Sequence, residues 1–171
     1  DVESLRKSIP EIQYIAPRIQ KGNFGSAAAS VVNGKRSGSF AIYGDFPILL
    51  KIRSKDIYDG GRFINELDIK ESRKVCVIGE RTRKELFEDN INPIGEYIKI
   101  ENIFFRIIGI HKYVDEGGGS FDDDGDIHVP FTSFKRIFNS GERVGFLLIA
   151  GFDDVDILKV EEKVKTQLKI I

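Results

Sequence analysis

Three stretches that follow one another decide how this chain folds: GRFINELD (Gly61–Asp68), RKVCVIGERTRKELF (Arg73–Phe87) and NPIGEYIKIENIFFRIIGI (Asn92–Ile110). In the second stretch, Val75–Ile78 predicts a buried strand, because a short apolar run ended by a glycine is typical of one. The residues after it, Arg81–Phe87, predict one or two helical turns with an apolar end.

The third stretch predicts a turn followed by a hairpin. Pro93 and Gly95 are turn residues, and the two runs after them, Tyr97–Ile100 and Ile103–Ile110, have the composition of strands. The polar pair Glu101-Asn102 joins these strands. The middle of the chain is therefore expected to consist mainly of strands.

Each end of the chain predicts a helix beside a strand. Asp1–Ile9 has apolar residues at spacings of three and four, and Glu11–Gln20 is strand-like. Near the other end, Val144–Ala150 predicts an apolar strand. Asp153–Leu168 predicts a helix with Asp153 at its N-cap.

The part between the first strand and the three stretches predicts a hairpin. Its strands are expected at Ala27–Val32 and Ser39–Tyr43, with the turn signal Asn33-Gly34 after the first. Pro47 argues against a central strand over Asp45–Arg53.

This succession resembles the extracytoplasmic core domain of MacB/FtsX-type ABC-transporter permeases. In that family, a strand ending in a hydrophobic residue and glycine leads to a helix ending in Leu-Phe. A P-x-G turn follows, and then a hairpin whose second strand carries Phe-Arg-hydrophobic-hydrophobic-Gly. The matching residues here are Ile78-Gly79, Leu86-Phe87, Pro93–Gly95 and Phe105–Gly109.

The resemblance continues on both sides of these motifs. Upstream, Gly61-Arg62-Phe63 with the acidic residues Glu66 and Asp68 matches the family's G-R-F segment. Downstream, the acidic run Asp122–Asp126 leads into Ile127–Thr132, which is similar to the family's acid-rich loop and the strand and helix after it.

The resemblance implies a mixed α/β (α+β) fold in two lobes. Both chain ends, residues 1–53 and 140–171, would form a porter-like α/β lobe, and residues 54–139 an inserted, mainly β lobe. The two terminal helices would end on the same side of the molecule. We also expect at least half of six apolar residues beside the two lobe crossings to be buried: Ile48, Leu49, Leu50, Ile52, Ile137 and Phe138.

The resemblance further implies a non-catalytic domain on the periplasmic, or otherwise extracytoplasmic, side of a bacterial inner-membrane protein. Its implied partners are the parent's own transmembrane helices and a cytoplasmic ATPase, together with a periplasmic adaptor or lipoprotein. The parent permease is expected to be a homo- or heterodimer.

The composition further limits which partners and which membrane topology the sequence predicts. Lys and Arg number 26 against 27 Asp and Glu, and no segment concentrates the basic residues, so nucleic acid is not an expected partner. The longest apolar run, Val144–Phe152, is far shorter than the roughly 20 residues of a membrane helix. Because the chain contains no methionine, we expect it to be part of a longer protein whose membrane spans lie beyond both ends.

No metal or cofactor is predicted. If Gly125 took position 6 of an EF-hand loop, Ser120 and Phe131 would fill positions 1 and 12, where that loop requires an aspartate and a bidentate glutamate. His111 and His128 lack further ligands at zinc spacing.

No catalytic residue is predicted either. Gly79 stands between a strand and a helix, as in a phosphate-binding turn, but no second glycine follows it, which favours a plain turn. Cys76 in mid-strand is typical of a small buried hydrophobe. Phe121, between three glycines and the acidic run, is the candidate for contact with a partner.

The leading hypothesis is therefore a non-catalytic domain that couples ATP-driven movement of membrane helices to the handling of a substrate or periplasmic partner. The alternative is an extracytoplasmic binding module that recognises a peptide, lipid or lipoprotein without mechanical coupling. A small hydrolase is a third hypothesis, although no G-x-S-x-G motif supports it.

Overall fold

The computed structural model describes residues 2–22, 27–113, 124–139 and 145–170. These residues form the predicted mixed α/β fold, with six helices and ten strands in the described part of the chain. The helices are α1 Val2–Ser8, α2 Leu49–Ile52, α3 Glu66–Lys70, α4 Glu80–Leu86, α5 Phe131–Ile137 and α6 Ile157–Ile170. The strands are β1 Ile12–Lys21, β2 Ala29–Asn33, β3 Arg36–Phe40, β4 Ile42–Asp45, β5 Lys55–Ile57, β6 Val75–Gly79, β7 Tyr97–Ile100, β8 Ile103–Tyr113, β9 Ile127–Pro130 and β10 Phe146–Gly151.

All ten strands belong to one sheet. Its order is β10-β1-β4-β9-β6-β8-β7-β2-β3, and β5 pairs with the far end of β8. The pairs β4–β9 and β6–β8 are parallel, and the others are antiparallel. Strand β1 is long enough to serve two neighbours: Ile12–Arg18 lies against β10, and Ile19–Lys21 lies against β4.

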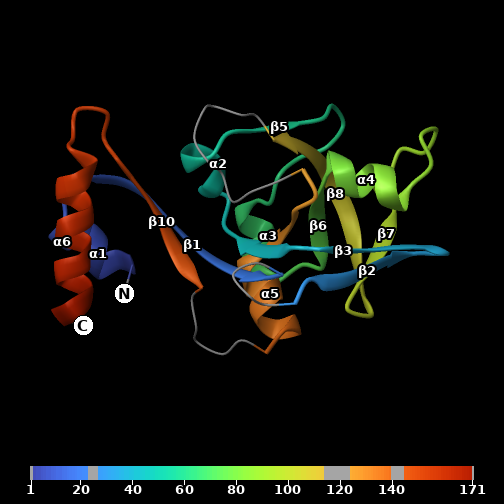
Figure 1. Ribbon diagram of the computed structural model, residues 1–171, viewed down its shortest axis with the longest axis horizontal. Coiled ribbons are helices and arrows are strands. Elements are labelled where there is room, and N and C mark those ends of the chain that lie inside the picture. Colours follow the sequence, from blue (N-terminus) through green and yellow to red (C-terminus); the bar gives the residue numbers. More distant parts are fainter. Residues whose placement is uncertain (1, 23–26, 114–123, 140–144, 171) are drawn as a thin grey trace.

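The helices and strands are arranged in two lobes (Figure 1). Each lobe has its own cluster of buried side chains. In what we call the end lobe, α1 and α6 lie side by side against the outer part of β1 and β10. Its core consists of Leu5, Ile9, Ile12, Ile15, Val160 and Val164. The first and last described residues lie at the same end of the molecule, which confirms that prediction.

The remaining elements form the central lobe, whose largest core cluster draws on β1 to β4 and on β6 to β9, with α4 and α5 packed against it. The predicted boundaries, residues 1–53 with 140–171 and residues 54–139, stay a prediction. In the structure, β2, β3 and β4 share their buried core with β6, β7, β8 and β9.

Some of the predicted element boundaries were wrong. The returning hairpin strand begins at Arg36, directly after a turn at Gly34-Lys35, and not at Ser39. Pairing then breaks at Ala41, because β3 continues the sheet beside β2 while β4 moves to β1 and β9. One predicted strand is therefore two.

Helix α6 also begins later than predicted. Asp153 lies in a turn in which the Val155 amide donates to the Phe152 carbonyl. The N-cap is Asp156, whose Oδ1 accepts from the Leu158 amide at 3.0 Å.

Candidate functional site: the junction between the lobes

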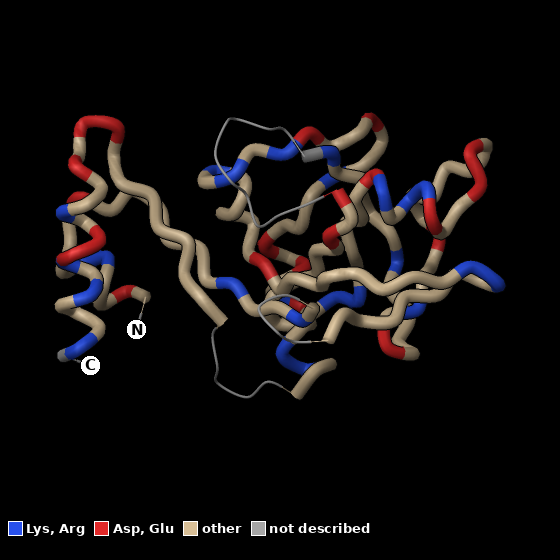
Figure 2. The backbone as a smooth tube through the Cα atoms, viewed as in Figure 1, with Lys and Arg blue, Asp and Glu red and all other residues tan. Residues whose placement is uncertain are grey.

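The ribbon formed by β1 and β10 carries the chain from the end lobe to the central lobe. Its only charged residues are Arg18 and Lys21, so that most of the ribbon is uncharged in Figure 2. Arg18 lies opposite Phe146, at the last paired position before β1 turns to β4. It is therefore the only charged residue in the part of the ribbon that both strands share.

Arg18 is fully buried and forms an ion pair with Asp45 at the end of β4. Its Nε donates to Asp45 Oδ1 at 2.5 Å, and its Nη2 donates to Oδ2 at 3.0 Å. His128 on β9 donates from Nδ1 to the same Oδ2 at 2.6 Å. Three strands are thus tied together by one buried carboxylate.

The surroundings fix the charge on each of these groups. Burial by itself raises the pKa of Asp45, but the Arg18 charge and the hydrogen bond from His128 outweigh it, so the pKa lies below its usual value. Burial lowers the pKa of His128 even though the Asp45 hydrogen bond opposes this. His128 is therefore neutral at pH 7, with its proton on Nδ1, where it can donate.

Aromatic rings enclose both side chains. The Arg18 guanidinium carbon lies 4.1 Å from the centre of the Tyr43 ring and 5.6 Å from that of Phe146. The contact with Phe146 adds β10 to the three strands already joined. His128 stacks on Tyr43 and meets the Phe63 ring edge-on.

The structure also brings together the two histidines of the chain. The ring centres of His111 and His128 are 4.9 Å apart. His111 Nε2 donates to the Asp126 carbonyl at 2.7 Å. His128 Nε2 is buried without a hydrogen-bond partner among the described residues. No three His, Cys, Asp or Glu side chains in the described ranges are grouped so as to hold a metal ion.

Helix α2 packs against the ribbon from the central lobe. Leu49 is fully buried with Phe63, Ile64 and Val77, and half-buried Leu148 of β10 packs against this cluster. The expectation that at least half of the six crossing residues are buried was wrong. Only Leu49 is fully buried, and the other five are half-buried: Ile48, Leu50, Ile52, Ile137 and Phe138.

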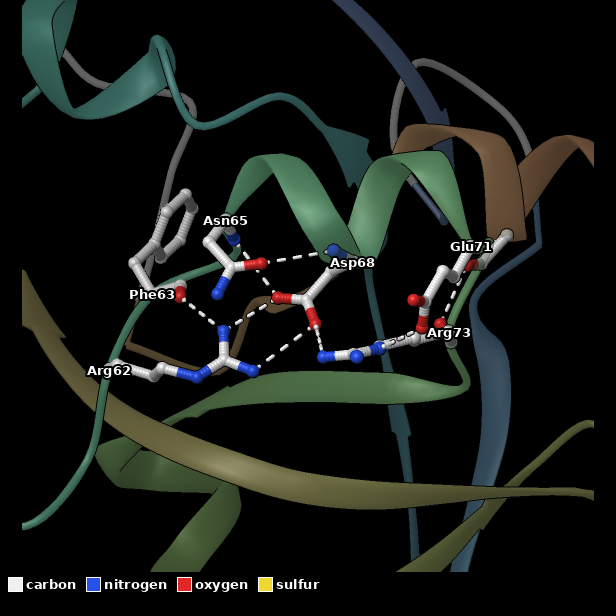
Figure 3. A network of polar contacts seen from close by, with 7 residues as sticks. Arg62, Phe63, Asn65, Asp68, Glu71 and Arg73 are labelled. Carbon is white, nitrogen blue, oxygen red and sulfur yellow. Dashed lines mark hydrogen bonds and ion pairs between the residues drawn. The ribbon is translucent and has the colours of Figure 1, made fainter.

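A second carboxylate network stabilises the start of α3 (Figure 3). Asn65 and Asp68 form a reciprocal capping box, in which each side chain accepts from the other's backbone amide. Arg62 donates to both Asp68 oxygens, at 2.6 and 3.1 Å, and Arg73 approaches at 3.5 Å. The Gly61-Arg62-Phe63 segment therefore has a local structural role, with Phe63 turned toward His128.

The structure gives a steric reason for the glycine at position 79. A Cβ at Gly79 would lie 1.8 Å from the Asp124 carbonyl oxygen. That carbonyl accepts from the Arg81 amide, and Thr82 Oγ1 donates to the Gly125 carbonyl at 2.8 Å. The glycine thus admits the segment that leads into β9.

The other candidates of the sequence lie elsewhere. Phe121, with Asp122 and Asp123, lies outside the described residues. Cys76 is fully buried, and burial raises the pKa of its thiol, so the thiolate that reacts as a nucleophile is not formed. None of the helices in the described part of the chain is both long enough and apolar enough to cross a membrane.

Comparison with known proteins identifies a family and similar proteins. The family described as MacB-like periplasmic core domain matches residues 1–167. The chain is 29% identical over 162 residues to the pyoverdine export ATP-binding/permease protein PvdT of Pseudomonas syringae pv. tomato, a match that covers 94% of this chain and 24% of that protein. It is 33% identical over 136 residues to the macrolide export ATP-binding/permease protein MacB of Syntrophobacter fumaroxidans, covering 79% and 18%. The matched part is thus about a quarter or less of the length of these curated relatives.

Solved structures share the fold. The periplasmic region of MacB from Actinobacillus actinomycetemcomitans superposes with a TM-score of 0.78 at 23% identity, over 98% of this chain and 70% of that one. The extracellular domain of the ABC-type transporter YknZ from Gram-positive bacteria superposes with a TM-score of 0.73 at 14% identity, over 93% and 75%.

Proposed function

The chain belongs to the MacB-like periplasmic core domain family, as the order of its motifs predicted, and we propose that it works as a non-catalytic coupling element of an ABC-transporter permease. Movement of the parent's membrane helices would enter through the end lobe, where both described chain ends lie. The β1/β10 ribbon would pass it to the central lobe.

One observation carries this proposal: the ribbon meets the central lobe at a buried ion pair. Arg18 and Asp45 are both fully buried, and Arg18 contacts Phe146 of β10 as well as Tyr43 of β4. Removing one partner of a buried pair leaves the other charge uncompensated, which costs about 3–5 kcal/mol. A movement of the ribbon that separated Arg18 from Asp45 would likewise leave buried charges uncompensated. The pair therefore opposes a change in the angle between the ribbon and the central lobe, as a coupling element requires.

The proposal includes the setting of the domain. The parent would be an inner-membrane protein, a homo- or heterodimer driven by a cytoplasmic ATPase, and this domain would lie in the periplasm. A periplasmic adaptor or lipoprotein would contact it from outside. The relatives named as export ATP-binding/permease proteins support this setting.

The test compares two variants in the full-length parent. Arg18→Lys keeps the charge but loses the two-pronged bond to Asp45 and the flat contact with Tyr43. We expect ATP hydrolysis to persist while transport falls at least severalfold. Asp45→Asn, which removes the pair, should have a larger effect in the same direction.

Asp68→Asn is the matched control, because Asp68 is an equally buried carboxylate held by arginine, but in α3 and away from the ribbon. It should lower thermal stability without separating ATP hydrolysis from transport. Normal transport in folded Arg18→Lys protein, or equal loss in the Asp68 control, would contradict the proposal.

The alternative, a binding module without mechanical coupling, has one observation in its favour. Two adjoining apolar grooves of about 340 and 490 Å³ run beside α6, and both include Leu147, Ile149 and Val164. If Arg18→Lys leaves transport intact while Leu147→Asp abolishes it, the binding module is the better explanation.

A further inference from the structure

The hairpin of β7 and β8 exposes two aromatic rings on the outer side of the sheet. Tyr97 and Phe104 are each 56% exposed, and few other large hydrophobic side chains of the described chain are more exposed. The alternate residues on the same strands, Ile98 and Phe105, are fully buried in the central core. The sheet therefore has one closed face and one open face here.

Two basic residues alternate with the two aromatic residues on this open face. In the register of the hairpin, Tyr97 lies opposite Arg106, and Lys99 lies opposite Phe104. Each strand thus carries one aromatic and one basic side chain, two residues apart. The Lys99 ammonium lies 5.0 Å from the centre of the Phe104 ring. We call these four residues the β7–β8 patch.

The basic groups of the patch are not neutralised within the described residues. Neither Lys99 nor Arg106 forms an ion pair there, whereas Arg62, Arg73, Arg81 and Arg83 all do. Glu101, at the hairpin turn, is directed elsewhere: its Oε1 accepts from the Ser30 amide and lies 3.4 Å from Lys21 Nζ. The patch therefore presents two positive charges between two aromatic faces.

We propose that the β7–β8 patch binds an acidic segment of a partner protein in which carboxylates alternate with apolar side chains. Carboxylates would pair with Lys99 and Arg106, and apolar groups would cover Tyr97 and Phe104. Successive side chains on one side of an extended chain are about 7 Å apart, which is also the spacing along β7. Arginine and tyrosine are among the residues that contribute most to protein interfaces.

This inference rests on the proposed function for the presence of a protein partner outside the membrane. Its test is a binding measurement on the 171-residue chain, so its failure is distinct from a failure of coupling in the parent. The probe is a synthetic ten-residue peptide made of glutamate, leucine and serine, in which the glutamates alternate with the leucines. The matched peptide carries glutamine in place of every glutamate.

Amide chemical shifts of the labelled chain report the site of binding. The acidic peptide should shift the amides of the patch first, and the glutamine peptide should not. Lys99→Glu/Arg106→Glu should weaken binding at least tenfold, and Tyr97→Ser/Phe104→Ser at least threefold. All four side chains are exposed, so the variants should keep the dispersed spectrum of the folded chain.

Lys7→Glu/Lys51→Glu is the charge-matched control, because both lysines are exposed and lie on α1 and α2, away from the patch. Equal weakening in this control would show general charge attraction and overturn the proposal. So would equal binding of the glutamine peptide. If heparin or phosphatidylglycerol vesicles shift the patch amides and the acidic peptide does not, the partner is a glycan or a lipid surface, and the proposal is wrong.

Discussion

The two lobes cover their apolar residues to different extents. In the central lobe, Leu86 and Phe105 are fully buried in a cluster to which the sheet, α4 and α5 all contribute. In the end lobe, one face of α6 buries Val160 and Val164, yet Ile157 and Leu168 on the same face are 53% and 49% exposed. A helix normally covers its whole apolar stripe. The end lobe therefore covers only part of its own.

Because of this difference, we expect the two lobes to resist local unfolding to different extents. The central lobe has a closed core. It resists local opening, because opening it would break all of its apolar contacts together. The end lobe relies on six buried side chains and on a ribbon with only two strands. Regions with few buried apolar contacts open at lower free energy, and moving elements are drawn from such regions. A lobe that receives membrane motion fits this description.

The largest expected effect is in the central core. Leu86→Ala should lower the free energy of unfolding by about 3–5 kcal/mol, because Leu86 is fully buried in the main cluster and the truncation leaves a cavity. Leu168→Ala in α6 should cost less than about 1 kcal/mol, since half of that side chain is already in water. Urea unfolding followed by circular dichroism measures both. Similar losses would mean that the two lobes are equally closed.

The next effect is a loss of stability in mild acid, caused by His128 of β9, which contacts Asp45 at the junction with the ribbon. Its pKa in the folded protein is lowered, while in the unfolded chain it is about 6.5. Below that value the unfolded state binds the proton first, so stability falls with falling pH, by at most about 1.4 kcal/mol per pH unit. The lowered pKa of Asp45 acts in the same direction, but only near and below pH 4.

Urea midpoints at pH 7.5, 6.5 and 5.5 check this prediction. His128→Gln is the suitable variant, because the glutamine amide can still donate to Asp45 but does not titrate. The loss between pH 6.5 and 5.5 should be smaller in this variant. An unchanged slope would assign the acid sensitivity to another group.

The sequence was sufficient to predict a helix or strand where the signals for its ends lie close to it in the chain. β6, β7, β8 and α4 were predicted closely, because each is bounded by its own turn residues: Gly79, the Pro93–Gly95 turn and the Glu101-Asn102 pair. The order of these elements also identified the family. The spacing of Asp68 from Asn65 is also a local signal, because it is that of a capping box.

The junction could not be predicted in this way. Arg18 and Asp45 are 27 residues apart, and Asp45 and His128 are 83 apart, so only the sheet order brings them together. An arginine in a strand is ordinarily assigned to solvent, and nothing in the spacing of the two histidines points to a buried carboxylate. The open β7–β8 patch was missed because alternation predicts which residues share a face, not which face is covered.

A smaller effect should appear in hydrogen exchange. Amides of α6 should exchange at least about tenfold faster than those of β6, which corresponds to an opening free energy about 1.4 kcal/mol lower. Helix α4 is the control, because it is also a surface helix but anchors fully buried Leu86 in the central core. Equal protection of α6 and β6 would mean that the two lobes open as a single unit.

The smallest effect concerns where α6 begins, and so where the end lobe joins the ribbon. Asp156→Ala should lower stability by about 0.5–1 kcal/mol, because the Leu158 amide loses its acceptor. Asp153→Ala removes the same charge three residues earlier and should change stability by less than about 0.3 kcal/mol, since no cap depends on it. Thermal unfolding of both variants, with the helical signal followed separately, distinguishes them. If the helical signal of Asp156→Ala melts before the rest, the end lobe opens independently of the central lobe. If both variants unfold in one transition and Asp153→Ala costs as much, the helix is capped at Asp153 in solution, and the later start of α6 is wrong.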